Sequence, residues 1–204
     1  MSTNTIITIE RQYGSGGHLI GEKLAESLGI PFYDSELIKV AAKESGICEE
    51  IFESFDEKPT TSFLYSLVMD PYSLGYNSNS FDLPLNHKVF LAAFDTIKEL
   101  ASKGPCVFVG RCADYILRDR EDCLKVFLYA DEETKENRIQ EIYGEAGLKL
   151  KNRVKDMDVR RGLNYKYFTG QDWGKAQNYD LALNRGSLGI EKCAQLIVDA
   201  ASEE

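Results

Sequence analysis

A glycine-rich turn near the N-terminus, Gly14-Ser15-Gly16-Gly17, constrains the fold more than any other stretch of the sequence. The apolar residues Ile6, Ile7 and Ile9 precede it and predict a short buried strand. Apolar residues at helical spacing follow it and predict a helix that ends near Leu28. Glycines let a backbone turn with positive φ, and a helix start carries about half a positive charge. The order strand, glycine turn, helix therefore predicts an anion-binding turn, and a tight turn without a ligand is the alternative.

The rest of the chain alternates apolar runs with helical patterns. Strands are expected near residues 6–9, 30–34, 106–109, 125–129 and 179–183, and helices near 19–28, 35–42, 49–57, 87–102, 113–118, 132–142, 148–168 and 189–201. This alternation predicts an α/β fold with a mostly parallel, five-stranded sheet flanked by helices. A chain of 204 residues suits a single domain.

Charge and composition exclude several classes of protein. The net charge of −9 argues against a protein that coats nucleic acid, which needs a broad basic face. We expect no membrane span and no signal peptide, because no apolar run is long enough for either. The five cysteines are scattered without CxxC spacing and the two histidines form no ligand pattern, so we expect reduced thiols in a cytoplasmic protein and no protein-held metal site.

One segment, residues 58–86, differs from the rest. It contains three prolines and five aromatic residues. A segment this long between regular elements is typical of a lid, a binding loop or a contact surface, and an irregular cover over the core is the alternative. We expect it to form an acceptor-side subdomain or a contact through which copies of the chain associate.

The standard phosphate-binding (P-loop) signature, GxxxxGK[ST], places a lysine and a hydroxyl residue directly after its second glycine. In register with the glycine turn, Gly16 keeps that second glycine, but Arg11 stands at the first. Gly17 replaces the lysine and His18 replaces the Ser/Thr. The glycines can still form a nest of backbone amides, and Arg11 or His18 could restore the missing positive charge.

A rival signature, GxGxxG, binds dinucleotides. Gly14 and Gly16 fit its first two positions, but Leu19 occupies the third. Asp34 lies twenty residues after Gly14, where an acid that binds ribose would stand. A dinucleotide-binding oxidoreductase therefore remains a disfavoured alternative.

Arginines follow the predicted strands and fill a polar helix. Arg111 comes directly after the strand at 106–109, at the edge of a parallel sheet where ligands bind. Its guanidinium is suited to a phosphate, and a salt bridge to Asp114 or Asp119 is the alternative. Farther on, spacing places four residues on one face of a helix: Arg153, Asp156, Arg160 and Asn164. Taken alone, that face is typical of a solvated, ion-paired helix.

With these pieces in order, the chain resembles the nucleoside monophosphate kinases, and most closely the cytidylate kinase-like family. Together the following stretches carry the resemblance, which covers most of the chain except residues 58–86: ITIERQYGSGGHLIGEKLAESLGIPFYDSELI, VFVGRCADYIL, KVFLYADEETKENRI, VRRGLNYKYFTGQDWG and YDLALNRGSLGIEKCAQLI. The resemblance implies a three-layer P-loop kinase fold in one domain that uses ATP and Mg²⁺. Its parts would be a core (1–57, 87–142 and 175–204), an acceptor-side insert (58–86) and a helical lid (143–174).

The resemblance also implies roles for individual residues. The donor phosphates would be held by Gly14, Ser15, Gly16, Gly17 and His18. The acceptor would be faced by Asp34, Arg111 and Asp114. Charge on the transferred phosphoryl group would be neutralised by the lid arginines Arg138, Arg160 and Arg161, with Asp158 near them to orient them. Arg11 or His18 would replace the missing P-loop lysine as a catalytic cation. A closing lid excludes water, and positive charge stabilises the phosphoryl oxygens in the transition state.

Two departures separate this chain from cytidylate kinases. The GK[ST] signature is missing, and Cys112 stands directly after Arg111 where the family has an aspartate. Despite these departures, the resemblance leads us to expect a kinase that transfers the γ-phosphoryl group of ATP to a nucleoside monophosphate or another small acceptor. A nucleotide-binding module that has lost catalysis is the alternative.

Overall fold

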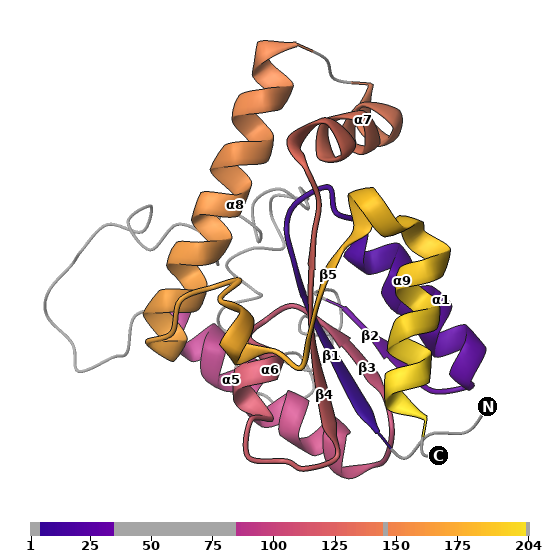
Figure 1. The fold of residues 1–204 in the computed structure, drawn as a ribbon. Helices are drawn as coiled ribbons and strands as arrows, with labels where there is room; N and C mark the ends of the chain where they lie inside the picture. The colour runs from indigo at the N-terminus through magenta and orange to yellow at the C-terminus, as the bar shows by residue number, and fades with distance from the viewer. Residues whose placement is uncertain (1–4, 35–84, 145–146, 203–204) are drawn as a thin grey trace, which may run out of the picture.

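The structure, a computed structural model, describes residues 5–34, 85–144 and 147–202. Five strands form one sheet in the order β2-β3-β1-β4-β5, and every neighbouring pair is parallel (Figure 1). Their bounds are Ile6–Arg11 (β1), Phe32–Tyr33 (β2), Val107–Val109 (β3), Cys123–Tyr129 (β4) and Leu181–Asn184 (β5). The predicted α/β fold with a five-stranded parallel sheet is confirmed.

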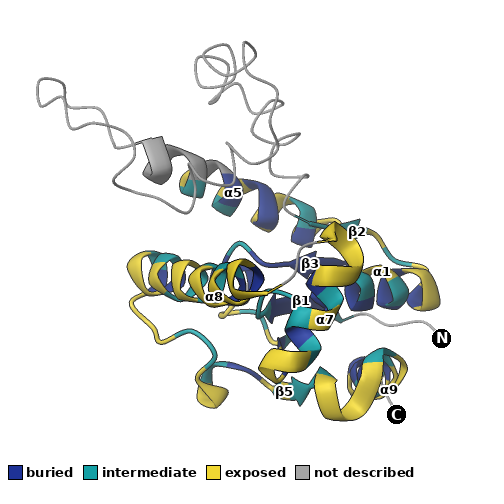
Figure 2. Cartoon of the chain, turned by 90° about the horizontal axis from the view of Figure 1, so that it is seen from above, coloured by how far each residue is buried: buried dark blue, intermediate teal, exposed yellow. Residues whose placement is uncertain are grey.

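Helices cover both faces of the sheet, as its apolar strands require. On one face lie α1 (Gly17–Leu28) and α9 (Arg185–Ala201), which pack against Ile7 and Ile9 of β1. On the other face lie α5 (Leu85–Ser102) and α6 (Ala113–Ile116), which pack against Ile6. Figure 2 shows the strands between these layers, with exposed residues on the outward sides of the helices.

Two further helices stand at the end of the sheet where β4 finishes. Asp131 caps α7 (Glu132–Tyr143), because its carboxylate accepts a hydrogen bond from the Thr134 N–H. The long helix α8 (Leu148–Thr169) follows and ends at Gly170. An apolar cluster of Ile139, Leu150 and Val154 joins the two helices. A short 3₁₀ turn, Ala176–Asn178, then leads into β5.

Most predicted boundaries lie close to the observed ones, and one differs for a clear reason. The closing helix was expected from residue 189, but α9 begins at Arg185. Asn184 caps it by accepting from the N–H groups of Gly186 and Ser187. Gly189 has φ 76° and ψ 169°, which interrupts the helix after its first turn. Several predictions fall outside the described residues. These are the helices expected near 35–42 and 49–57, Cys48, and the insert at 58–86 except for its last two residues, which belong to α5.

Two expectations about the whole chain have partial answers in the described residues. No helix there is long and apolar enough to span a membrane. Four cysteines, Cys106, Cys112, Cys123 and Cys193, are buried free thiols.

Candidate functional site

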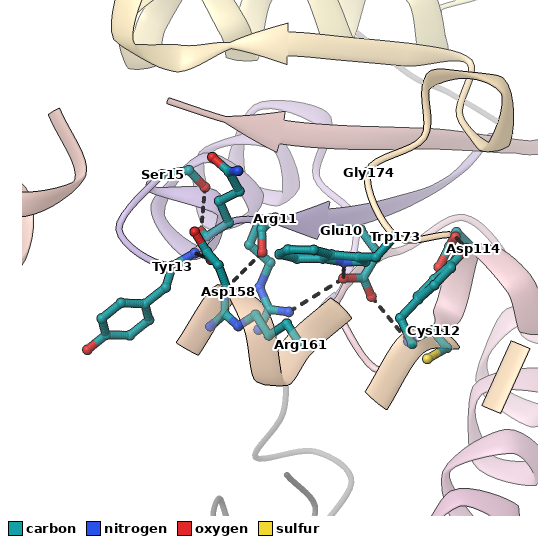
Figure 3. A network of polar contacts seen from close by, with 12 residues as sticks. Glu10, Arg11, Tyr13, Ser15, Cys112, Asp114, Asp158, Arg161, Trp173 and Gly174 are labelled. Atoms are coloured by element: carbon teal, nitrogen blue, oxygen red, sulfur yellow. Dashed lines mark hydrogen bonds and ion pairs between the residues drawn. The ribbon is translucent and has the colours of Figure 1, made fainter. Parts of the chain in front are cut away.

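The glycine turn forms a compact loop between β1 and α1. The Gln12 N–H donates to the carbonyl of Leu128 in β4, which fixes where the loop leaves the sheet. The Ser15 N–H and hydroxyl both donate to the Gln12 carbonyl, and Ser15 is fully buried (Figure 3). Gly14 and Gly16 have φ of 81° and 85°, a conformation that favours glycine. The Ser15 hydroxyl is therefore a structural part of the loop, and its role toward a donor stays a prediction.

Arg11 crosses the position that a P-loop lysine would start from. A Cβ at Gly17 would lie 2.7 Å from Arg11 Cγ and 2.8 Å from Arg11 Cβ. The guanidinium continues to the end of β3, where it lies against Gly110 so closely that a side chain there would collide with Arg11 Nη1. Because Gly17 and Gly110 have no side chains, they leave the space that Arg11 occupies. The positive charge of Arg11 lies between the ends of β1 and β3.

Two more arginines lie on the other side of the loop. A Cβ at Gly16 would be 3.6 Å from Arg138 Nε, on α7, and 3.7 Å from Arg185 Nε, at the start of α9. Burial and the neighbouring charge of Arg185 lower the pKa of Arg138. Two cationic side chains from two helices thus lie close to Gly16.

The long helix α8 is fastened to the loop by one carboxylate and one arginine. Asp158 accepts from the Tyr13 N–H at 2.6 Å and from Lys135 Nζ at 2.9 Å. Lys135 and Asp158 are 9% and 14% exposed, so this ion pair is largely shielded from water. Arg161 Nη1 donates to the Arg11 carbonyl at 2.9 Å (Figure 3). Helix α8, expected as part of a lid, is in contact with the loop in this structure.

A buried acidic pair lies beneath α8. Glu10 accepts from the Cys112 N–H and from Trp173 Nε1, and Asp114 accepts from the Tyr165 hydroxyl at 2.6 Å (Figure 3). Burial, and then the charge of Glu10, raises the pKa of Asp114 to about 7. Asp114 is only 2% exposed. Its predicted contact with an acceptor therefore stays a prediction that requires α8 to move away.

The predicted acceptor residues Asp34 and Arg111 lie at the ends of neighbouring strands. His18 Nδ1 is 3.2 Å from Asp34 Oδ2, and His18 Nε2 is 3.3 Å from Glu22 Oε1. The His18 side chain therefore turns toward β2, away from the arginine pair at Gly16. Arg111 has φ 64° and Cys112 φ 56°, both rare for residues with a side chain. The hydrogen bond from the Cys112 N–H to Glu10 supports this strained turn, which positions Arg111.

The remaining predicted residues divide into two groups. Arg11, Arg138 and Arg161 come from three elements and lie at the loop. Arg160 is exposed on α8 and makes no hydrogen bond or ion pair with the residues that the structure describes. The structure does not bring Arg160 into contact with the loop, and its catalytic role stays a prediction.

Two residues at the loop were missed by the sequence analysis. Arg185 directly follows β5, much as Arg111 follows the end of β3 with one residue between them, and the argument applied to Arg111 would have found it. Lys135 gave no such signal, because one lysine on a charged helix is ordinary until the fold buries it beneath Gly14.

The described residues do not fit a magnesium site held by protein side chains. His18 stands where the P-loop hydroxyl would coordinate the ion, and the buried hydroxyl of Ser15 is bonded within the loop. No group of three or more carboxylate, histidine or cysteine side chains in the described part could hold a metal.

With this geometry established, comparisons with known proteins place the chain. Residues 6–187 match the cytidylate kinase-like family, which is most of the chain. The chain belongs to the cytidylate kinase-like family. No curated protein matches it in sequence. The family match supports a kinase-like protein and leaves the substrate open.

Solved structures share this fold. An uncharacterized protein from Eubacterium ventriosum is 26% identical with a TM-score of 0.73, covering 98% of this chain and 99% of its own. Shikimate kinase from Bacteroides thetaiotaomicron is 14% identical with a TM-score of 0.53, covering 96% and 97%. A gluconokinase from Sinorhizobium meliloti is 13% identical with a TM-score of 0.52, covering 99% and 100%. At these identities the two named kinases show the shared fold alone.

Proposed function

We propose that this cytidylate kinase-like chain transfers the γ-phosphoryl group of ATP to a nucleoside monophosphate or another small acceptor. The observation that carries the proposal is the course of Arg11 over Gly17. The P-loop lysine is absent from position 17, and an arginine side chain fills the space above that position. The aliphatic part of Arg11 covers Gly17, and its guanidinium, supplied from the strand instead of the helix, lies against Gly110 with Nη1 3.9 Å from Glu10 Oε2.

The reaction needs little covalent chemistry from the protein. An acceptor oxygen forms a bond to the γ-phosphorus while the bond from that phosphorus to the bridging oxygen breaks, and ADP leaves with the electron pair. Negative charge spreads over the three phosphoryl oxygens in the transition state, so catalysis consists mainly of positioning and electrostatic stabilisation. Arg11, Arg138 and Arg161 supply three cations around the loop for that purpose.

The two classes of acceptor differ in whether the reaction needs a general base. A monophosphate attacks through an anionic oxygen that carries no proton, whereas a hydroxyl must lose its proton to a base. Glu10 and Asp158 are occupied by hydrogen bonds inside the protein. Among the residues that the structure describes, Asp34 lies at the end of β2 with Oδ2 3.2 Å from His18 Nδ1, and it is the carboxylate that we propose takes a proton from a hydroxyl acceptor. Its replacement therefore distinguishes the two acceptor classes.

The test is ADP formation from ATP and Mg²⁺ with a panel of nucleoside monophosphates and of small polyols and hydroxy acids. Acceptor-dependent ADP supports the proposal, and Arg111→Ala should raise the KM for the acceptor. Asp34→Asn should abolish turnover with a hydroxyl acceptor and spare the chemical step with a monophosphate. Arg120→Gln is the matched control, because Arg120 pairs with Asp122 before β4, at the opposite end of the strands.

One outcome supports a different function. Saturable ATP binding with no turnover for any acceptor in the panel would identify a nucleotide-binding module that has lost catalysis. The observation that favours this alternative is the loss of the two P-loop side chains at Gly17 and His18.

A further inference from the structure

Arg185 and Arg138 converge on Gly16 from two different helices. Each places its Nε within 3.7 Å of the point where a Cβ at Gly16 would lie. Gly16 is also the residue that precedes α1, so the first N–H groups of that helix open on the same place. Among the residues that the structure describes, neither guanidinium has a hydrogen bond or an ion pair, and Arg185 Nε is buried without a partner.

This arrangement of Arg138 and Arg185 is electrostatically unfavourable when no anion is bound at the loop. Two like charges repel, and the repulsion is stronger where water is partly excluded. The direction of the Arg138 pKa agrees, because burial and Arg185 both lower it. An anion between the two guanidinium groups would convert the repulsion into two charge-assisted hydrogen-bonded contacts.

The position of Arg185 is held by its own neighbours. Asn184 caps α9 at the residue before it. A side chain at Gly186 would collide with Asp131 Oδ2 at the start of α7, so the starts of α9 and α7 are in close contact. Arg185 is therefore presented to the loop by the packing of two helix starts and not by a flexible segment.

We propose that Arg185, together with Arg138, binds the polyphosphate of the nucleoside triphosphate donor at Gly16. The proposal rests on the proposed kinase function and adds a donor-binding residue that the P-loop signature does not contain. Arg11 then serves the side of the loop that faces β3, and the Arg138–Arg185 pair serves the side that faces α7 and α9. The positive charge that a P-loop lysine concentrates in one side chain is divided between the two sides.

The test is calorimetric titration of inorganic tripolyphosphate and of ATP, without an acceptor, at fixed ionic strength. The proteins are wild type, Arg185→Gln, Arg138→Gln, the double variant and the control Arg120→Gln. We expect Arg185→Gln to weaken tripolyphosphate binding about 10- to 100-fold, as for loss of a charge-assisted contact. The control should bind within twofold of wild type, and the double variant should lose less than the product of the two single losses.

A second readout separates binding from a structural role. Removing one of two repelling charges should leave the Tm of the ligand-free protein unchanged or higher, while the rise in Tm caused by tripolyphosphate shrinks. A residue that only supports the fold would lower the ligand-free Tm. If Arg185→Gln does not fold, Arg185→Lys is measured instead, and a loss of threefold or more is expected because lysine lacks the planar fork.

The outcomes distinguish this inference from the proposed function. Tripolyphosphate affinity of Arg185→Gln within twofold of wild type, or unchanged affinity of Arg185→Lys where that variant is used, overturns the inference even if the wild type turns over acceptors. Weakened binding in Arg185→Gln supports it even if no acceptor is turned over. Absence of binding by the wild type overturns it together with the kinase proposal.

Discussion

The Arg11 side chain lies over Gly17, at the place where a P-loop lysine would begin. A Cβ at position 17 would come within 2.7 Å of Arg11 Cγ. The lysine and this arginine therefore cannot occupy their positions together without a shift of the loop. The loss of lysine at 17 and the gain of arginine at 11 form one steric arrangement.

This relationship predicts that Gly17→Ala destabilises the wild type and not an Arg11→Gly variant. In the wild type we expect the free energy of unfolding to fall by about 1–3 kcal/mol, the usual cost of overpacking. In the Arg11→Gly background the same change should be neutral or stabilise by up to about 1 kcal/mol, because alanine favours a helix over glycine. Urea denaturation of the four proteins gives the coupling energy.

Gly162→Ala in α8 is the control for that cycle. A Cβ there would have its nearest contact at 3.6 Å, an ordinary van der Waals distance to Trp173. Its effect on stability should be the same in both backgrounds. Equal effects of Gly17→Ala in both backgrounds would show that Arg11 does not exclude a side chain at position 17.

The Lys135–Asp158 pair should contribute strongly to stability. Asp158→Ala removes the partner of a buried ammonium group and of the Tyr13 N–H, so we expect a loss of about 3–5 kcal/mol in the free energy of unfolding. Lys135→Met should cost less, because Asp158 keeps the Tyr13 N–H. The exposed pair of Lys166 and Asp172 is the control, and Lys166→Met should change stability by less than about 1 kcal/mol. Similar losses for both pairs would contradict the anchoring of α8 to the loop.

The pattern of apolar residues predicts the sheet and most helices because burial imposes it directly. Ile6, Ile7 and Ile9 are all buried, and the strand predicted from them is the centre of the sheet. The kink at Gly189 and the cap at Asn184 set the start of α9, and a hydrophobic pattern carries no sign of either. Sequence therefore locates elements well and their polar ends less well.

The stability of this protein should depend on pH through Asp114. Its pKa is raised from 3.8 to about 7, so the folded protein binds a proton that the unfolded chain releases at lower pH. Stability therefore falls as pH rises from about 4 to about 7, and the full penalty is present above pH 7. Asp114→Asn removes the ionisation and keeps an acceptor for the Tyr165 hydroxyl.

Urea denaturation of wild type and Asp114→Asn between pH 4.5 and pH 8 checks this. The variant should gain on the wild type as pH rises, by on the order of 2–4 kcal/mol at pH 8. A difference that stays constant across the range would show that Asp114 is ionised in the folded protein throughout.

The two neighbouring arginines of α8 should behave differently on replacement by alanine. Arg161 contacts the loop through the Arg11 carbonyl, so Arg161→Ala should lower both stability and turnover. Arg160 is exposed, so Arg160→Ala should leave stability within about 0.5 kcal/mol. If Arg160 meets the transferred phosphoryl group, its loss should lower kcat about 100-fold or more with little change in ATP affinity.

Lys155→Ala is the control on the same helix, since Lys155 is also exposed and carries one positive charge. The measurement is kcat and ATP affinity for Arg160→Ala, Arg161→Ala and Lys155→Ala. Equal kcat values for Arg160→Ala and Lys155→Ala would remove Arg160 from the catalytic residues.

The site is harder to predict than the fold because its residues are brought together by packing between distant segments. Alignment with the P-loop signature singles out Arg11, but no spacing rule shows that its side chain crosses Gly17 and reaches Gly110. His18 has the helix-start position expected for a phosphate ligand, and its side chain lies beside Asp34, which the position alone does not indicate. Side-chain direction depends on neighbours that only the assembled sheet defines.

The central claim is that Arg11 takes the place of the P-loop lysine in phosphoryl transfer, and single-turnover transfer of the labelled γ-phosphoryl group of ATP tests it most directly. Wild type and Arg11→Ala are compared with an acceptor from the panel, alongside ATP affinity. We predict that the wild type labels the acceptor and that Arg11→Ala does so about 100-fold more slowly or worse. Transfer by Arg11→Ala at the wild-type rate, or no transfer by the wild type to any acceptor, would contradict the account.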